Sequence, residues 1–98
     1  MLGVKRMRWS AEKSLSLKAE RGVSFAEVLS AIAQGGLLKV MDHPNRAKYG
    51  HQKMLVVRIR DYAYVVPCVE SDSEIFLKSI IPSRKATRDF LPGDKRDE

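Results

Sequence analysis

The stretch VSFAEVLSAIAQGG, residues 23–36, constrains the fold more than any other part of the chain. Ser24 and Glu27 have the spacing of a capping box, and Val23 and Val28 have the spacing of a hydrophobic staple. Apolar side chains then recur at the i, i+3, i+4, i+7 spacing of a single helix face: Phe25, Val28, Leu29 and Ile32. The glycine pair at the end of the stretch stops this pattern. We therefore predict a helix that packs one face against a hydrophobic core.

The residues before this helix predict a strand and another helix. LGVKRMRW, residues 2–9, alternates weakly between apolar and polar residues, as an edge strand does. Ser10 can cap a helix that has Glu12 in its first turn, and Gly22 can end that helix in the left-handed conformation.

Beyond residue 36 the pattern of apolar residues changes to the period of strands. We predict strands over residues 37–42, 53–60, 61–70 and 74–81, with a loop over residues 43–52. A tight hairpin at Arg60–Asp61–Tyr62 joins the second and third of these strands. Pro67 has no N–H group, which indicates a sheet edge or a bulge at that point.

The C-terminal part predicts a short final helix, SRKATRDFL, which Ser83 caps and which Pro92–Gly93 ends. Residues 93–98 are expected to be a frayed, charged tail. The chain is long enough for one domain, residues 1–98. We predict an α+β fold, in which two N-terminal helices pack on a four- to five-stranded, mostly antiparallel sheet and a short helix follows it.

The chain is basic. Its 18 Lys and Arg residues exceed its 12 Asp and Glu residues, which gives a formal net charge of +6. An excess of this size on a small domain favours an anionic partner, either nucleic acid or an acidic protein. The alternative is that the charge serves solubility alone.

The cations form three groups along the chain. The groups are Arg46 and Lys48 with His51 and Lys53; Arg58 and Arg60; and Arg84, Lys85 and Arg88. If the strand over 53–60 lies beside the start of the final helix, then Lys53, Arg58, Arg84 and Lys85 converge. Backbone N–H groups at a helix start bind anions, and cations there would reinforce a phosphate site. The alternative is three separate, solvated basic faces.

Several classes of site find no support in the sequence. Cys68 is the only cysteine, so the chain can form neither an intrachain disulfide nor a cysteine zinc cluster. The two histidines, His43 and His51, lie in a loop with few further ligands, and no glycine-rich phosphate loop or nucleophile elbow occurs. We predict no metal and no cofactor, and this leaves little support for a small metabolic enzyme.

Two further absences concern the location of the protein. No apolar run approaches the roughly 20 residues that a membrane span needs, and residues 1–10 do not contain the apolar segment of a signal peptide. We expect a soluble, cytoplasmic protein that does not associate with membranes.

RNA cleavage is one reaction that a basic site can perform without metal. A base activates the ribose 2′-OH, cations stabilise the charged transition state, and an acid protonates the leaving 5′ oxygen. His51 is the natural acid or base near neutral pH. Weaker candidates are Tyr49, Tyr62, Tyr64 and Glu70.

Two motifs resemble a known family. The opening RWSAEKSLSLKAERGVSF carries the first motif at Trp9, Lys13, Gly22, Val23 and Phe25. The closing SRKAT carries the second motif at Ser83, Arg84, Lys85, Ala86 and Thr87. Together they resemble BrnT-type toxins, which are ribonucleases of type II toxin–antitoxin systems, and the likeness extends over roughly residues 7–91. The chain departs from the family pattern at Ser10, Leu17 and Arg21, and these departures could weaken its activity.

The resemblance implies a RelE-like fold, metal-independent mRNA cleavage on or off the ribosome, and inhibition of translation. It also implies a cognate DNA-binding antitoxin that neutralises the basic face and brings the complex to operator DNA. The residues expected to act in catalysis are His51, Lys53, Arg58, Arg84 and Lys85. Those expected to bind RNA are Arg46, Lys48, Arg60 and Arg88. The alternative is a non-catalytic basic module that binds an acidic protein or nucleic acid.

Overall fold

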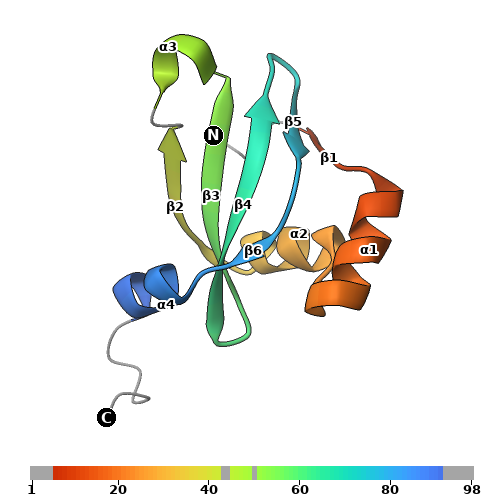
Figure 1. Ribbon diagram of the computed structural model, residues 1–98, viewed down its shortest axis with the longest axis vertical. Coiled ribbons are helices and arrows are strands. Elements are labelled where there is room, and N and C mark those ends of the chain that lie inside the picture. The colour runs from red at the N-terminus through yellow and green to blue at the C-terminus, as the bar shows by residue number, and fades with distance from the viewer. Residues whose placement is uncertain (1–5, 43–44, 50, 92–98) are drawn as a thin grey trace.

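The computed structural model describes residues 6–42, 45–49 and 51–91. Within these ranges the chain forms helices and strands in the order β1 (Arg6–Arg8), α1 (Ala11–Arg21), α2 (Phe25–Ala33), β2 (Leu37–Asp42), α3 (Arg46–Tyr49), β3 (Gln52–Ile59), β4 (Tyr62–Glu70), β5 (Glu74–Leu77), β6 (Ile81–Pro82) and α4 (Arg84–Phe90) (Figure 1).

The strands form one sheet in the order β1-β5-β4-β3-β2, and β6 pairs with β4 beside β5. The pairing of β1 with β5 is parallel, whereas the other pairings are antiparallel. The predicted α+β class and the mostly antiparallel sheet are therefore confirmed, whereas the described residues form six strands and not the predicted four to five. The strand at the start of the chain is also an edge strand, as predicted, although residues 2–5 of the prediction lie outside the described residues.

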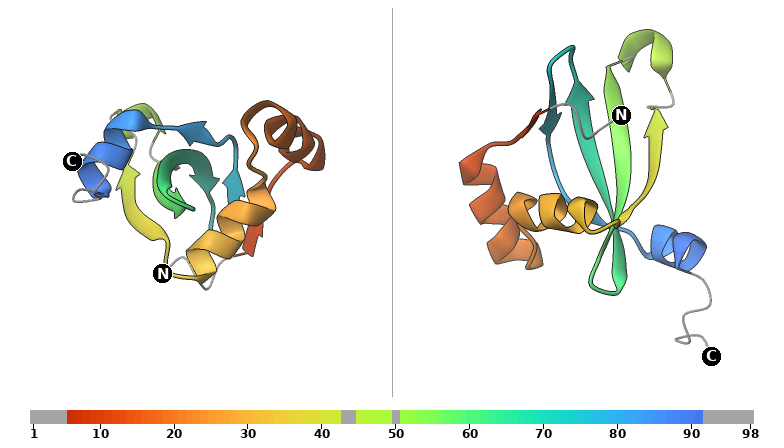
Figure 2. Two further views of the ribbon diagram at one scale, coloured as in Figure 1. Left: turned by 90° about the horizontal axis from the view of Figure 1, so that it is seen from below. Right: turned by 180° about the vertical axis from the view of Figure 1, so that it is seen from behind.

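Helices α1 and α2 cover one face of the sheet, where the larger core lies (Figure 2). Leu17 of α1 and the buried α2 residues Phe25 and Val28 pack there against alternate residues of β3 and β4. Trp9 contributes a tilted aromatic contact with Phe25, with ring centroids 5.9 Å apart. This core forms because the apolar stripe of α2 meets strands whose side chains alternate between faces.

Helix α4 lies on the opposite face and covers a smaller core. Val56 of β3, Ala63 of β4 and Ala86 of α4 are buried together there. Ser83 caps α4 as predicted, since its Oγ accepts the N–H of Ala86 at 3.0 Å. The proposed stop at Pro92–Gly93 and the tail lie outside the described residues.

Two predicted elements differ in the structure. Residues 46–49, predicted as loop, form the short helix α3, in which the side chain of Asn45 accepts the N–H of Lys48. The predicted strand over 74–81 is broken into β5 and β6, and the residues between them leave the sheet.

Pro67 accounts for the break between β5 and β6. The prediction that Pro67 lies at a sheet edge or a bulge was wrong. It lies within β4, an interior strand, where it pairs with Met54 of β3. Its carbonyl accepts the N–H of Lys78 at 2.8 Å, so its nitrogen faces the same side, where β5 has ended and β6 has not begun. A residue without an N–H can occupy an interior strand here because the neighbouring strand is interrupted.

Among the described residues, no helix has the length and apolar character that crossing a membrane requires.

Candidate functional site

Strand β3 separates the predicted site residues into two groups. Lys53 and Arg58 are five residues apart on this strand, which corresponds to roughly 17 Å. An odd separation also places the two side chains on opposite faces of the sheet. The structure therefore does not bring Lys53 together with Arg58, as the convergence predicted from the sequence requires.

One group lies where β3 begins, which we call the α3 end. Lys53 Nζ is 2.7 Å from Asp42 Oδ1 and 3.9 Å from Glu70 Oε1, and its side chain is only 28% exposed. His51 is exposed, and its carbonyl accepts the N–H of Glu70. Lys48 is exposed on α3, and Arg46 is the first residue of that helix. The charge of Lys53 is thus matched locally by carboxylates.

The second group lies where β3 turns into β4, which we call the hairpin end. Arg58 pairs in register with Ala63 of β4. Both backbone groups of Ala63 bind the start of α4: its N–H donates to Thr87 Oγ1 at 2.9 Å, and its carbonyl accepts the N–H of Ser83 at 3.1 Å. These two bonds attach the start of α4 to the residue that pairs with Arg58, while the convergence of Arg58 with Arg84 and Lys85 stays a prediction.

The cations of α4 point away from the sheet because the other side of the helix is buried. Ala86 and Thr87 face the sheet, whereas Arg84, Lys85 and Arg88 are exposed. Lys85 forms an ion pair with Asp89 one turn later at 3.2 Å, and its side chain is 78% exposed. Since Ser83 already accepts the N–H of Ala86, anion binding at this helix start depends mainly on the side-chain charges.

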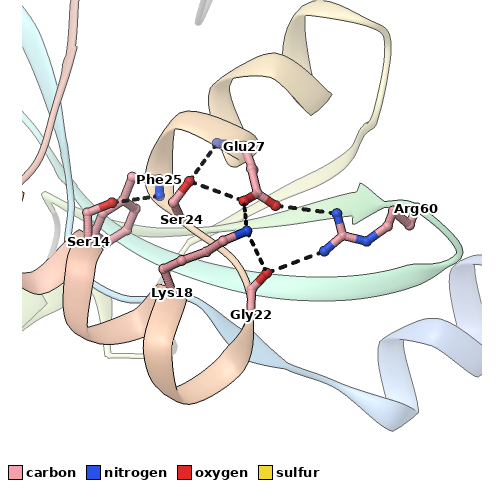
Figure 3. Close-up of polar contacts among 7 residues, drawn as sticks. All are labelled: Ser14, Lys18, Gly22, Ser24, Phe25, Glu27 and Arg60. Carbon is pink, nitrogen blue, oxygen red and sulfur yellow. Dashed lines mark hydrogen bonds and ion pairs between the residues drawn. The ribbon is translucent and has the colours of Figure 1, made fainter.

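Arg58 and Arg60 extend the basic surface to the hairpin loop. Arg58 donates from Nε to the carbonyl of Arg60 at 3.0 Å and contacts Asp61 at 3.3 Å. Arg60 adopts a φ of 59°, which is uncommon for a residue other than glycine. Its guanidinium contacts Glu27 Oε1 at 3.3 Å and the carbonyl of Gly22 at 3.4 Å (Figure 3). The hairpin loop is thereby tied to the junction of α1 and α2.

Glu27 is the central residue of this junction. Its Oε2 accepts a hydrogen bond from Lys18, and the hydroxyl of Ser24 lies 3.4 Å from the same oxygen (Figure 3). The hydrogen bond from Lys18 lowers the pKa of Glu27 below its ordinary value of 4.5, and Arg60 adds to this effect, while partial burial opposes it. The carboxylate therefore stays ionised near neutral pH. The Ser24 half of the predicted capping box is present, since Ser24 Oγ accepts the N–H of Glu27.

An open pocket of about 440 Å³ lies between α2 and the hairpin. It is lined by Glu27, Ser30, Ala31, Gln34, Gly35, Gly36, Arg58, Ile59 and Arg60. Gly36 is required where the two elements meet, because a Cβ there would lie 2.8 Å from the carbonyl oxygens of both Ala31 and Arg58. Reasoning from the sequence missed this pocket: the glycine pair signals such a close approach, but was interpreted only as a helix stop.

The remaining acid–base candidates divide between the two ends. Glu70 lies at the α3 end beside Lys53. Tyr49 is the last residue of α3, and its side chain is outside the described part of the structure. Tyr62 and Tyr64 lie on β4 near the hairpin, with ring centroids 5.6 Å apart in an edge-to-face contact. Burial raises the pKa of the Cys68 thiol to about 11, so this side chain remains protonated and unreactive.

The three departures from the family pattern have structural roles here. Ser10 caps α1 by accepting the N–H of Lys13, and Leu17 lies in the larger core. Arg21 donates to the carbonyl of Ile80, in the segment between β5 and β6. Within residues 6–42, 45–49 and 51–91, no group of three His, Cys, Asp or Glu side chains could hold a metal ion.

Comparisons of the chain with protein-family models, with curated proteins and with solved structures gave no match in any of the three.

Proposed function

We propose that the protein is an endoribonuclease toxin of a type II toxin–antitoxin system, with a RelE-like fold, and that it binds the RNA backbone at its hairpin end. The observation that supports this proposal is the double anchoring of α4 on Ala63, the residue that pairs with Arg58. The resemblance of the two sequence motifs to BrnT-type toxins supplies the reaction class.

The cations at the hairpin end are accessible to phosphate. The side chains of Arg58, Arg60 and Lys85 are 50%, 65% and 78% exposed. Glu27, the partner of Arg60, is only 28% exposed, whereas the Arg58–Asp61 and Lys85–Asp89 ion pairs are exposed and contribute about 0–1 kcal/mol each. A phosphate group offers several acceptor oxygens to arginine and lysine, so it can replace these carboxylates at little cost.

The same cations suit the chemistry of RNA cleavage. Attack of the ribose 2′-OH on the adjacent phosphorus places additional negative charge on the phosphoryl oxygens, and the 5′ oxygen of the next nucleotide leaves. The product is a 2′,3′-cyclic phosphate, and no metal takes part in this scheme. Arg58, Arg84 and Lys85 would stabilise the charged transition state, Arg88 would bind a flanking phosphate, and Arg60 would contact the RNA at the hairpin loop.

The acid–base role proposed for His51 receives no support from its position at the α3 end. Tyr62 is the acid–base candidate at the hairpin end, where it directly follows the Arg60–Asp61 loop. A tyrosine hydroxyl can act as a general acid or base toward a sugar oxygen. Tyr62 pairs with Ile59 of the larger core and therefore lies on the α2 face, opposite Arg58, so this proposal assigns no residue to the proton transfer.

The partners follow from the same surface. An acidic antitoxin would cover the hairpin end and prevent mRNA from binding, either free or on the ribosome. If this antitoxin also binds DNA, the complex would reach operator DNA through the antitoxin and not through the toxin. The setting for such a toxin is the cytoplasm, where its mRNA substrate is.

Cleavage of a labelled mRNA in EDTA tests the proposal. The wild type, with or without added ribosomes, should leave 2′,3′-cyclic phosphate ends, and the variant Arg84→Ala/Lys85→Ala should not cut. Lys13→Ala/Lys78→Ala is the matched control, since it removes the same charge from two other exposed positions. Cleavage by the Arg84→Ala/Lys85→Ala variant at the wild-type rate would contradict the assignment of the site.

A second candidate function is a non-catalytic module that uses the same surface to bind an acidic protein or nucleic acid. The observation that favours it is the position of His51, which leaves the described hairpin end without a histidine. RNA binding that depends on Arg84 and Lys85, without any cleavage in the presence of ribosomes, would support this function over the first.

A further inference from the structure

The pocket between α2 and the hairpin combines opposite charges within a small volume. The Glu27 carboxylate lies on the α2 side and the Arg60 guanidinium lies on the hairpin side, 3.3 Å apart at their closest atoms (Figure 3). At about 440 Å³ the pocket is within the range of small-molecule sites. A ligand that suits it must present hydrogen-bond donors next to hydrogen-bond acceptors.

The carboxylate is held in place by residues behind it. Lys18 and Ser24 contact Oε2, whereas Oε1 contacts Arg60 on the pocket side. Arg60 has five N–H donors and uses two of its nitrogens in the contacts with Glu27 and Gly22. Both groups therefore retain hydrogen-bonding capacity, and the contacts of Glu27 reduce the entropy that ligand binding would cost.

The end of α2 adds further polar groups to the wall. Gln34 caps this end, and Ser30 and Gln34 both line the pocket and contact one another at 3.3 Å. The C-terminal end of a helix carries a partial negative charge, which favours hydrogen-bond donors on a ligand. Gly35 contributes no side chain, and a Cβ at this position would meet nothing within 4 Å.

Among the four RNA bases, guanine alone presents two adjacent donors, N1–H and N2–H₂, beside the acceptors O6 and N7. Two adjacent donors match a carboxylate, and arginine binding to O6 and N7 is the commonest specific contact to guanine. Uracil has one ring donor, while adenine and cytosine each carry one amino group next to an acceptor nitrogen. The charges of the pocket therefore match guanine better than the other bases.

We propose that this pocket binds a guanine base of the RNA substrate, with Glu27 Oε1, the carboxylate oxygen on the pocket side, accepting from the base N1–H and Arg60 donating to O6. This inference rests on the proposed function, since it names the base next to the cleaved phosphate. Arg58 links the two sites because it both lines the pocket and pairs in register with Ala63, which anchors α4. Among the cations of the proposed phosphate site, Arg58 is the one that also lines the pocket.

Binding of the four nucleoside 5′-monophosphates to the ¹⁵N-labelled full chain, followed by NMR, tests the pocket without RNA cleavage. We expect GMP to bind about tenfold more tightly than AMP, CMP or UMP, with shifts at the amides of Gly35 and Gly36. Glu27→Gln, which keeps a capping-box residue, should remove the preference for GMP.

A pair of variants on one helix separates occupation of the pocket from general binding. Ser30→Trp fills the pocket from an exposed position and should abolish GMP binding, whereas Ala33→Trp adds the same side chain outside the pocket and should not. Equal binding of all four nucleotides, absence of saturable binding, or wild-type GMP binding by Ser30→Trp would overturn the inference.

The outcomes distinguish this inference from the proposed function. Selective GMP binding without RNA cleavage would support the pocket and contradict the ribonuclease. Cleavage of mRNA with no preference among bases and no selective GMP binding would support the ribonuclease and overturn the guanine pocket.

Discussion

The two ends of strand β3 carry cations of the same kinds but hold them differently. At the α3 end, Lys53 lies between Asp42 and Glu70 and is 28% exposed. At the hairpin end, Arg58 and Lys85 make exposed ion pairs with carboxylates three and four residues away in sequence, and each is at least 50% exposed.

This difference shows that the number of cations in a segment does not determine whether they can bind an anion. A lysine held between carboxylates of two neighbouring strands already has its counter-ions, and a phosphate must displace both. An exposed pair within one helix turn or one hairpin contributes little and is easily exchanged. The hairpin end is therefore the better candidate for binding RNA.

The largest expected effect comes from removing cations at each end in turn. Arg84→Ala/Lys85→Ala should weaken RNA binding by about tenfold or more and flatten the slope of log affinity against log salt by about 1.4, since about 0.7 is expected per phosphate contact. His51→Ala/Lys53→Ala should change both by much less. Fluorescence anisotropy with a labelled single-stranded RNA over a salt series measures both quantities. Equal losses of RNA affinity in the two double variants would contradict the proposed difference between the two ends of β3.

A second test loosens α4 without changing any charge. Thr87→Val removes the hydroxyl that accepts the buried N–H of Ala63. We expect the free energy of unfolding to fall by about 1–3 kcal/mol, together with a loss of RNA affinity as α4 moves. Chemical denaturation measures the stability. Thr87→Ser keeps the hydroxyl and serves as the control, so a matching loss in that variant would argue against the hydrogen bond as the cause.

A third test attempts to make the α3 end resemble the hairpin end. Asp42→Asn/Glu70→Gln removes the two carboxylates beside Lys53 and should raise RNA affinity about two- to threefold. Glu12→Gln/Asp72→Asn makes the same change in net charge at two other exposed positions. If both variants gain equally in the anisotropy assay, net charge is the cause and the counter-ions of Lys53 are not.

The smallest expected effect concerns the pH dependence of stability. The pKa of Glu27 is lower in the folded protein than its ordinary 4.5, so the unfolded chain takes up this proton first as the solution is acidified. The stabilisation that the ionised Glu27 carboxylate provides is complete above pH 4.5 and is lost as the pH falls through the pKa of Glu27 in the folded protein. Chemical denaturation should show that the difference in free energy of unfolding between the wild type and Glu27→Gln shrinks below pH 4.5. A difference that stays constant with pH would contradict the ion-pair origin.

Local signals were sufficient to predict most of the elements. Ser10, Ser24 and Ser83 cap helices as expected, because each accepts a backbone N–H three residues later and needs no distant contact. The hairpin and the antiparallel strands follow from alternation and a short loop. The break between β5 and β6 was not predicted because it depends on how β4 is flanked on both sides.

The candidate site was predictable only in part. The two bonds to Ala63 place the start of α4 beside the strand that pairs with Arg58, whereas the convergence of Arg58 with Arg84 and Lys85 stays a prediction. The prediction that Lys53 joins these cations was wrong, because Lys53 lies near the start of β3 and Arg58 lies near its end. The pocket could not be predicted, because Glu27 and Arg60 are 33 residues apart and no local pattern pairs them.

The sequence by itself determined the net charge, the helix caps, the apolar faces and the α+β class, since each depends on residues close together in the chain. The tertiary structure alone decided which cations share an end of the sheet, which carboxylates neutralise Lys53, and that Glu27 faces Arg60. The physical reason is that strand pairing and helix docking bring distant residues within the few ångströms over which hydrogen bonds and ion pairs act.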